Sequence, residues 1–449
     1  MTVSNSTEIT AIAGGGWAGL ATAVKLSAHG QKVLLLEASG QLGGRARSVP
    51  VNNKRLDNGQ HILLGAYRGF LDMLEILGLM ESDIVYRKKL DLCIHSLHGS
   101  GIKICAAALP GPFHLFVGVI TARGLNITDK TGIIRFWLHL LKTGFTLESD
   151  MCVADYLGKH RQSKRVTNTF WGPLCIAALN TTPAMASARI FLNVLRKSFT
   201  GSRHNSDMLL PRVGLGDMLP APASRYIRQR GGQVNTNERV LEIIMDGEIL
   251  SGIKTSCQDY SVSNLVLATP CRQTGKLLMP LPGLKDITER LGQLKQEAII
   301  TLYMQFPETI RIENDMAGIY DGLTQWLIDR RTCGQPGLIA AVISTNGPHL
   351  DMNRDELEKT IISETRQLFP EWPEPESTFL LREKQATFSC TCGSDRLRPR
   401  CESVGNGIWL AGDYIDTGLP STLESAIQSG LQCADRILQK SVGNQTIRG

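Results

Sequence analysis

Residues 8–37, EITAIAGGGWAGLATAVKLSAHGQKVLLLE, carry the pattern that decides the fold. Their apolar runs predict a strand, a helix closed by Gly30 and a second strand, in this order: Glu8–Ala13, Leu20–His29 and Lys32–Glu37. A G-x-G-x-x-G turn, Gly14–Gly19, joins the first strand to the helix. A strand, a glycine turn, a helix and a parallel strand together predict a dinucleotide-binding unit.

The three glycines of this turn have different expected tasks. Gly14 permits the tight turn, Gly16 lets the backbone approach a pyrophosphate, and Gly19 lets the helix pack closely on the strand. The free N–H groups at the start of the helix face the phosphates, and Trp17 and Ala18 of the turn are also expected to bind the cofactor. We therefore expect a pyrophosphate site at this turn.

The second strand and the loop after it indicate which dinucleotide binds. Glu37 ends the strand, where a carboxylate accepts hydrogen bonds from ribose hydroxyls, and Ala38 follows it. Gly43 and Gly44 then precede Arg45, which could reach back to the pyrophosphate as a charge-assisted donor. This extension is typical of FAD proteins of the glutathione-reductase-like, amine-oxidase type, so FAD is the predicted cofactor.

The C-terminal region predicts contacts to the other half of the cofactor. Gly412 and Asp413 end an apolar strand, and the carboxylate is expected to bind the ribityl or pyrophosphate region. Thr422 and Leu423 open a helix whose N–H groups would face the flavin edge where negative charge collects on reduction. An ordinary helix with Ser421 or Thr422 as its N-cap explains the same residues.

A polar segment, Asp57–His61 (DNGQH), follows another strand-like run. Gly59 allows close approach to a flavin ring, and His61 is the candidate that could donate to the flavin or to the substrate. A satisfied structural histidine is the alternative explanation. The loop Gly214–Gly216 lacks a third glycine, so no second nucleotide site is predicted.

Composition limits the partners and the compartment. A net charge of +6 without a dense basic run argues against nucleic-acid binding. Eleven cysteines without a framework and a polar N-terminus predict a reducing cytoplasm. Cys390, Cys392 and Cys401 have no CxxC pair or nearby His, so no metal site is expected.

The most apolar stretch, Cys105–Ala122, is interrupted by two prolines and a histidine, so it does not predict a spanning helix. The apolar segments from 105 to 145 are candidates for a substrate channel and for a membrane dock, through Phe113, Leu115 and Phe116. Core packing explains them equally well. Mild positive charge fits peripheral contact with the inner face of a membrane.

The predicted domains alternate along the chain. The FAD-binding domain is expected in three segments and the α+β substrate domain in two, the first of them a helical insert. In order, the five segments alternate between FAD-binding and substrate domain: 1–90, 91–205, 206–275, 276–395 and 396–449.

The motifs together resemble the amine-oxidase and phytoene-desaturase superfamily. More narrowly, DNGQHILLGAY, LNTTPAMASARIFLNVL, LLPRVGLGDM and LAGDYIDTGLPSTLESAIQSG are similar to the hydroxysqualene dehydroxylase family, from about Ile9 to Ala434. The resemblance implies FAD contacts on the glycine turn, Glu37, Arg45, Asp413 and Leu423, and a backbone contact to adenine at Val240. Tyr414–Asp416 departs from the family pattern of Trp-Thr-Ala, which leaves contacts near Tyr414 open.

This resemblance implies reductive removal of the hydroxyl of hydroxysqualene, a long-chain isoprenoid, to give squalene on the hopanoid route, with upstream squalene-pathway enzymes as compatible partners. The implied path ionises an allylic alcohol and delivers hydride from flavin N5. A carotenoid-type desaturase and an amine oxidase remain alternatives, although an amine oxidase would want an aromatic cage. A flavin-free prenyl-binding protein of the GDP-dissociation-inhibitor fold is the non-enzyme alternative.

Overall fold

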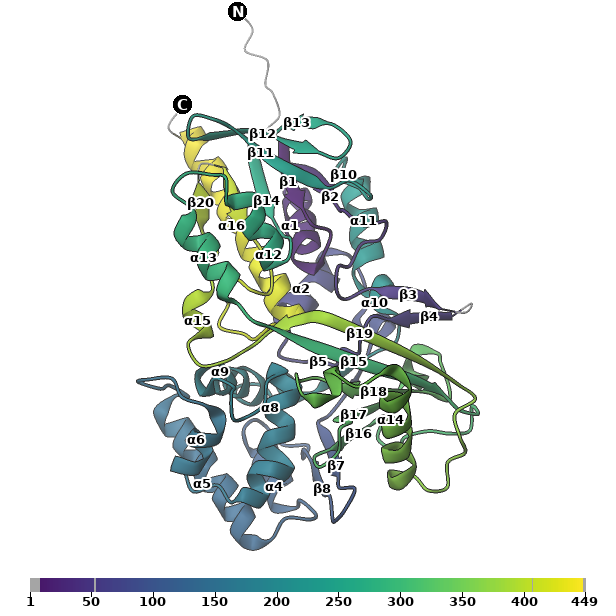
Figure 1. Cartoon of the computed structure of the whole chain (residues 1–449). Helices are drawn as coiled ribbons and strands as arrows, with labels where there is room; N and C mark the ends of the chain where they lie inside the picture. Colours follow the sequence, from purple (N-terminus) through teal and green to yellow (C-terminus); the bar gives the residue numbers. More distant parts are fainter. Residues whose placement is uncertain (1–8, 52–53, 406, 447–449) are drawn as a thin grey trace, which may run out of the picture.

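The structure, a computed structural model, describes residues 9–51, 54–405 and 407–446. The chain forms two halves, one above the other in Figure 1. A six-stranded sheet organises the upper half, and a seven-stranded sheet beside a group of helices forms the lower half. The prediction of a Rossmann-like α/β domain combined with an α+β unit is therefore confirmed.

The six-stranded sheet has the order β10-β2-β1-β14-β21-β20, parallel throughout except for the edge strand β20. Its central strands are buried on both faces, which explains why they appear in the sequence as continuous apolar runs. Glu8, the predicted start of β1, lies outside the described residues. The strands span Ile9–Ala13 (β1), Lys32–Leu36 (β2), Gln233–Asn235 (β10), Asn264–Leu267 (β14), Ser403–Gly405 (β20) and Ile408–Leu410 (β21).

Helix α1 (Trp17–Ala28) begins three residues before its predicted start, because Gly16 is the N-cap of the helix. It ends at its C-cap, His29, and Gly30 follows with a φ of +72°. Helix α1, purple in Figure 1, packs against the long C-terminal helix α16 (Leu423–Thr446), which is yellow, and against α11 (Pro220–Gln229). The two ends of the chain thus build one domain.

Several local predictions agree closely with the structure. The predicted helix Arg354–Leu368 is α14, which starts with a capping box formed by Asn353 and Glu356. The predicted strand Glu297–Phe306 is β15 (Gln296–Gln305). The strand-like run from 233 to 244 is interrupted, because β10 and β11 belong to different sheets.

The seven-stranded sheet has the order β19-β15-β18-β17-β16-β7-β8, and it corrects one expectation. Residues 91–105 were assigned to the helical insert, but they form β7 and β8, and β7 pairs with β16 in parallel. The strands span Asp91–His95 (β7), Ile102–Cys105 (β8), Met316–Ile319 (β16), Trp326–Asp329 (β17), Leu338–Ile343 (β18) and Ser377–Phe388 (β19). The division of the chain into five domain segments stays a prediction.

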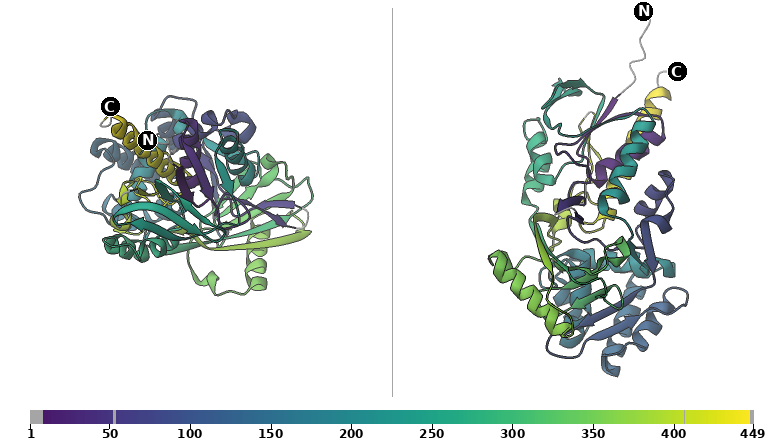
Figure 2. Two further views of the ribbon diagram at one scale, coloured as in Figure 1. Left: turned by 90° about the horizontal axis from the view of Figure 1, so that it is seen from above. Right: turned by 90° about the vertical axis from the view of Figure 1, so that its right-hand side faces the viewer.

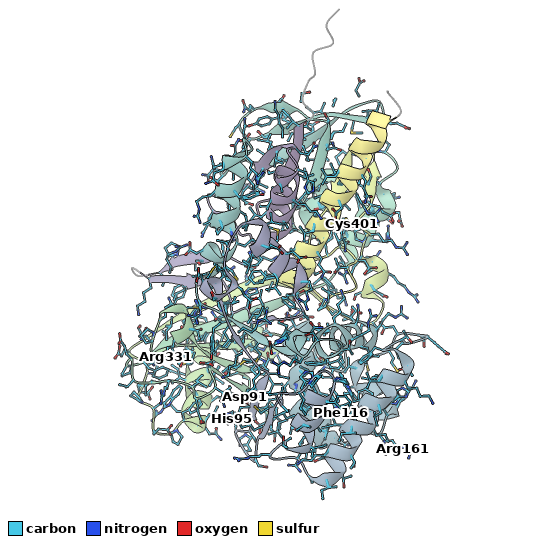
Figure 3. All side chains as sticks on the ribbon, turned by 180° about the vertical axis from the view of Figure 1, so that it is seen from behind. Asp91, His95, Phe116, Arg161, Arg331 and Cys401 are labelled. Carbon is cyan, nitrogen blue, oxygen red and sulfur yellow. The ribbon has the colours of Figure 1, made fainter. Side chains whose placement is uncertain are left out.

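A group of helices lies beside this sheet and was predicted from its apolar pattern. Its main members are α4 (Phe113–Ile120), α5 (Ile127–Thr143), α6 (Val153–Lys159), α8 (Gly172–Leu179) and α9 (Ala188–Phe199). Seen from behind, Phe116 and Arg161 lie in this helical group, and Cys401 lies at the other end of the molecule beside α16 (Figure 3). In the described part of the chain, no helix is long and apolar enough to cross a membrane.

The two halves lie one above the other in the side view of Figure 2 as well, and shorter elements complete them. Three small sheets are β3-β4, β5-β9-β6 and β11-β12-β13. Their strands span Ser48–Val51, Lys54–Asp57, Leu63–Leu64, Met208–Pro211, Val85–Lys88, Val240–Asp246, Ile249–Thr255 and Asp259–Ser261. The shorter α-helices are Arg68–Ile76 (α2), Glu81–Ile84 (α3), Lys164–Val166 (α7), Leu215–Met218 (α10), Cys271–Leu278 (α12), Lys285–Gln293 (α13) and Ser394–Leu397 (α15).

Candidate cofactor and substrate site

A cavity of about 590 Å³ runs from the carboxyl ends of β1 and β2 toward the helical group. Of the residues predicted to bind the cofactor, Gly19 alone does not line it. The others surround this one cavity: Gly14, Gly16, Trp17, Ala18, Glu37, Ala38, Gly43, Gly44, Arg45, Gly59, His61, Val240, Gly412, Asp413, Thr422 and Leu423. Their individual contacts to a cofactor stay predictions.

The glycine turn separates two kinds of glycine. A Cβ on Gly14 would lie 2.5 Å from the carbonyl oxygen of Ala268, and one on Gly19 would lie 2.0 Å from the carbonyl oxygen of Gly14. A Cβ on Gly16 would meet no atom within 4 Å. The packing of the chain itself thus leaves no room for a side chain at Gly14 or Gly19, whereas the space beside Gly16 is open to a ligand.

The start of α1 is suited to binding an anion. Its N-cap, Gly16, offers no side-chain cap, and no acidic residue lies in the first turn. The first N–H groups of a helix have no partner inside the helix, so those after Gly16 can bind phosphate oxygens. Gly43 pairs with this turn, because its N–H donates to the carbonyl oxygen of Gly15 at 2.8 Å.

Glu37 lies at the end of β2 and faces the cavity. Its two oxygens accept from the backbone N–H groups of Gly15, at 2.7 Å, and Ser39, at 2.8 Å. A carboxylate has about four lone-pair positions, so Glu37 can still accept from ribose hydroxyls while the backbone holds it in place. Val240 lies across the same part of the cavity.

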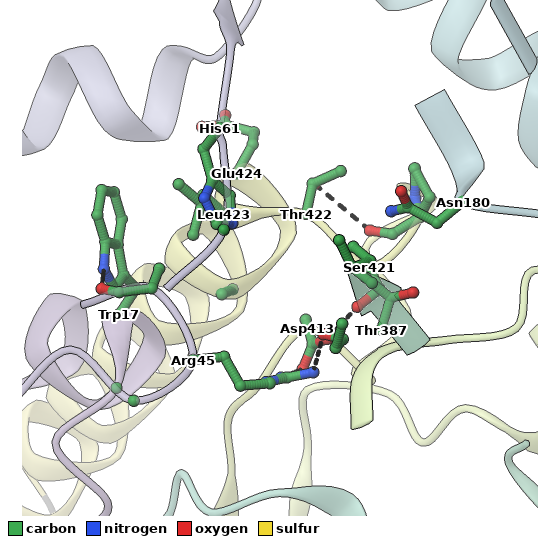
Figure 4. A pocket seen from close by; sticks show the side chains of 18 of the residues that line it. Trp17, Arg45, His61, Asn180, Thr387, Asp413, Ser421, Thr422, Leu423 and Glu424 are labelled. Carbon is green, nitrogen blue, oxygen red and sulfur yellow. Dashed lines mark hydrogen bonds and ion pairs between the residues drawn. The ribbon is translucent and has the colours of Figure 1, made fainter. Parts of the chain in front are cut away.

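Arg45 and Asp413 form an ion pair that the sequence did not predict. Arg45 Nη2 lies 2.5 Å from Asp413 Oδ1, and its Nη1 donates to the carbonyl oxygen of Ala386 at 2.8 Å (Figure 4). The Ser421 hydroxyl donates to the other Asp413 oxygen. Burial alone would raise the pKa of Asp413, but the attraction of Arg45 and these hydrogen bonds hold it below its usual range. Both residues line the cavity, so Arg45 could still reach a pyrophosphate.

The start of α16 is capped by Thr422, one of the two predicted caps. The Thr422 hydroxyl accepts from the N–H of Ser425 at 3.1 Å, while Ser421 is engaged with Asp413. Glu424, the second residue of α16, accepts from the N–H groups of Gly69, at 2.8 Å, and Phe70, at 3.0 Å. The helix start therefore faces the cavity and is tied to the start of α2.

His61 lies in the cavity wall, near Leu423 and Glu424 in Figure 4. Burial lowers its pKa to about 4, and Asp57 offsets only part of this effect. Its Nδ1 has no hydrogen-bond partner among the described residues. At neutral pH this imidazole is therefore uncharged, able to donate or accept one hydrogen bond, and its catalytic role stays a prediction.

Asp57, in contrast, is structural. It forms a buried ion pair with Arg330, Nη2 to Oδ2 at 2.8 Å, and it also accepts from Ser48 and from the N–H of Leu215. Gln60 accepts from Arg330 at 3.0 Å. The Gly214–Gly216 loop thus packs on the DNGQH segment. Sequence reasoning missed Arg330, because nothing local connects positions 57 and 330.

The part of the cavity toward the helical group is mostly apolar. A separate, smaller pocket of about 50 Å³ adjoins it, and Leu90, Leu92, Leu174 and Phe199 line both spaces. The smaller pocket is otherwise formed by Ile104, Leu115, Phe116, Val119, Ile133, Ile134, Trp137, Phe170 and Trp171. Tyr414, left open by the sequence, does not line the cavity; it is buried, and its hydroxyl lies 3.0 Å from that of Thr274.

These observations fit FAD. Open space at Gly16, uncapped N–H groups of α1 and the carboxylate of Glu37 could hold the ADP half, and the start of α16 could face the flavin. Two buried polar atoms of the cavity wall, His61 Nδ1 and Thr387 Oγ1, lack a partner among the described residues, as atoms that meet a ligand would. Within those same residues, no three His, Cys, Asp or Glu side chains gather where they could hold a metal ion.

Comparison with known proteins agrees with this geometry. The family model described as flavin containing amine oxidoreductase matches residues 17–438. A hydroxysqualene dehydroxylase of Sinorhizobium fredii is 27% identical, over 96% of this chain and 98% of its own. A 15-cis-phytoene desaturase of Solanum lycopersicum is 23% identical, over 95% and 77%. A putative protoporphyrinogen oxidase from Exiguobacterium has the same fold, with a TM-score of 0.71 and 18% identity over 97% and 99%.

The match to a flavin-dependent family covers nearly the whole chain, so the cofactor is FAD and the protein is an FAD-dependent oxidoreductase. The flavin-free prenyl-binding alternative is thereby set aside. The chain belongs to the flavin-containing amine oxidoreductase family.

Proposed function

We propose that this oxidoreductase removes the hydroxyl group of hydroxysqualene reductively, giving squalene and water. The observation that carries the proposal is the wholly apolar pocket that adjoins the cofactor cavity and shares four wall residues with it. Similarity to hydroxysqualene dehydroxylase over nearly the full length of both chains supports it.

The residues of the chain contribute binding, orientation and exclusion of water. A C30 isoprenoid has almost no hydrogen-bonding capacity, so its affinity must come from apolar area, at about 25 cal/mol per Å² buried. Leu90, Leu92, Leu174 and Phe199 continue this apolar lining from one pocket to the next. Exclusion of water by this wall also strengthens electrostatic interactions at the polar end, because the local dielectric constant is low.

At the polar end, the allylic hydroxyl must leave as water. Reduced FAD, when bound, supplies the hydride that replaces it. His61, with one free ring nitrogen, is the residue predicted to hydrogen-bond the hydroxyl. Because the imidazole is uncharged at neutral pH, its expected contribution is to orient the hydroxyl.

The test is a single turnover without oxygen. Holoenzyme reduced by light is mixed with hydroxysqualene, and both flavin reoxidation and squalene are measured. Equal amounts of reoxidised flavin and squalene are expected. Reduced flavin that persists, with no squalene, would refute the proposal. Reduction of the oxidised holoenzyme by a phytoene-like alkene would instead favour a desaturase, as the similarity to the tomato enzyme suggests.

We also propose that the protein works in the cytoplasm and docks on the inner face of the membrane through α4, where upstream enzymes of the squalene route could deliver the substrate. The helix has two apolar faces. Phe113 is 63% exposed, and Ile120 also faces outward, whereas Leu115 and Phe116 line the small pocket. Arg123 is exposed beside them and would favour anionic lipid.

Docking is tested with vesicles of phosphatidylcholine and phosphatidylglycerol. Phe113→Asp combined with Ile120→Asp should release the protein in a flotation assay. The matched control is Ile249→Asp, because Ile249 is also 63% exposed but lies on β12 at the other end of the molecule (Figure 1). Flotation of the double variant equal to that of the wild type would refute docking through α4.

A further inference from the structure

A lysine lies in the mostly apolar wall that α9 gives to the cavity. Val194, Leu195 and Phe199 line the cavity from this helix, and Lys197 lines it among them. The Lys197 ammonium makes no hydrogen bond and no salt bridge with the residues the structure describes. Glu424, at the start of α16 where the flavin is predicted to lie, lines the same cavity as Lys197.

Removal of a hydroxyl as water requires an acid, and the other titratable groups on this side of the cavity fit that task poorly. His61 is uncharged at neutral pH, since burial lowers its pKa to about 4. Burial raises the pKa of the Tyr67 hydroxyl, which therefore holds its proton tightly. Burial also raises the pKa of Glu424, but both of its oxygens accept hydrogen bonds, from Gly69 and Phe70, which fixes it as a link between two helices.

We propose that Lys197 is the acid that protonates the departing hydroxyl oxygen, an inference that rests on the proposed function. The ammonium gives a proton to the hydroxyl oxygen, and the C–O bond breaks with its electron pair leaving on water. The allylic cation that remains accepts hydride from reduced FAD, so a C–H bond forms while FAD is reoxidised. The Lys197 amine regains a proton from solvent before the next turnover.

The surroundings of Lys197 suit a donor of this kind. Burial lowers its pKa, the negative charge of Glu424 raises it in part, and the neighbouring Arg196 lowers it again. An ammonium with a lowered pKa gives up its proton more readily than a lysine in water. The reaction rate should therefore fall as pH rises through the pKa of Lys197, because the acid is then lost.

The experiment compares three holoenzyme variants with the wild type. Lys197→Met removes the acid, and Lys197→Arg keeps a cation that does not release its proton. Arg196→Met is the matched control, because Arg196 is an exposed cation one residue away. Flavin absorbance and melting temperature are checked first, so that only correctly folded, FAD-loaded variants are compared.

Two readouts decide the outcome. In single turnover, Lys197→Met and Lys197→Arg should form squalene about 10²–10⁴-fold more slowly and lose the decline at high pH. Arg196→Met should keep the wild-type rate at neutral pH and keep the decline, moved to higher pH because Arg196 no longer lowers the pKa of Lys197. In equilibrium binding to the oxidised enzyme, followed by tryptophan fluorescence, Lys197→Met should lose the preference for hydroxysqualene over squalene, and Lys197→Arg should keep it.

The failures are distinguishable. A wild type that forms no squalene overturns the proposed function and this inference together. An active wild type with Lys197→Met within twofold of its rate overturns the role of Lys197 alone. A Lys197→Met variant that is slow but keeps its binding preference and its decline at high pH also overturns it, because the lysine would then act from a distance.

Discussion

Changing Gly19 to alanine should lower the stability of the protein, whereas the same change at Gly16 should weaken FAD binding. A Cβ on Gly19 would lie 2.0 Å from the Gly14 carbonyl oxygen, and real Cβ atoms essentially never come closer than 3.0 Å, so α1 must move away by about 1 Å. Overpacking of this kind costs about 1–3 kcal/mol. With an unfolding entropy of about 2.1 cal/mol/K per residue, melting of the whole chain in one step gives a loss of about 1–3 °C.

Gly16→Ala, in contrast, meets nothing within the protein. Its cost to the fold is the exchange of one N-cap residue for another, about 1 kcal/mol or less. The new methyl group projects into the cavity where the pyrophosphate is expected to lie. We therefore expect the dissociation constant of FAD to rise at least about tenfold, which corresponds to about 1.4 kcal/mol.

The assay measures both quantities for both variants. Thermal melting is followed on the FAD-free protein, because bound FAD would carry differences in its affinity into the apparent stability, and FAD binding is titrated separately by quenching of its fluorescence. The expected result is a lower melting temperature for Gly19→Ala and weaker FAD binding for Gly16→Ala. Wild-type FAD affinity in Gly16→Ala would refute the placement of the pyrophosphate at this turn, and an unshifted melting temperature in Gly19→Ala would refute the packing argument.

Three further predictions concern other parts of the site. Asp57 and Arg330 are at most 3% exposed, so Arg330→Met leaves Asp57 as a buried charge without its partner and should lower the free energy of unfolding by about 3–5 kcal/mol. Adding Asp57→Asn should recover part of the lost melting temperature. The pKa of His61 is about 4 in the folded protein, against 6.5 in the unfolded chain. The contribution of His61 to stability is therefore complete above pH 6.5 and is lost as the pH falls toward 4. His61→Gln should flatten that part of a plot of melting temperature against pH. Leu174→Trp, at the junction of the two pockets, should slow turnover of a C30 substrate with FAD content unchanged, whereas equal rates would place the substrate elsewhere.

The sequence predicted well the elements that short-range signals determine. The β1-α1-β2 unit and α14 have caps, turns and hydrophobic periods inside their own residues, so their bounds were nearly correct. The strands β7 and β8 were missed because they are short and lie next to a long helical segment. The parallel partner of β7 is β16, which is more than 200 residues away, and single-chain periodicity gives no sign of such pairing.

The candidate site shows the same difference between features with local sequence signals and contacts between distant residues. Nearly all of the residues that sequence reasoning named for the cofactor line the cavity, because glycine turns and helix starts have local signatures. It did not find that Arg45 pairs with Asp413 or Asp57 with Arg330, since each pair joins positions that are hundreds of residues apart. Lys197 gave no signal either, because a lysine on an amphipathic helix is usually a solvent-facing residue.

The position of the helical group explains how one fold can serve different substrates. Putrescine oxidase has the same fold at 17% identity, with a TM-score of 0.73, although putrescine is a small diamine. The dinucleotide half offers groups that any FAD protein needs: an uncapped helix start, a carboxylate at a strand end and a second helix start. The residues of α4, α5, α8 and α9 instead supply much of the apolar wall, together with Lys197. A fold does not determine function, and here the residues that would choose a long apolar alcohol over an amine lie in this inserted segment. Exchanging side chains of α9 should therefore change which substrate reacts without changing FAD affinity, whereas changes at the glycine turn should do the reverse.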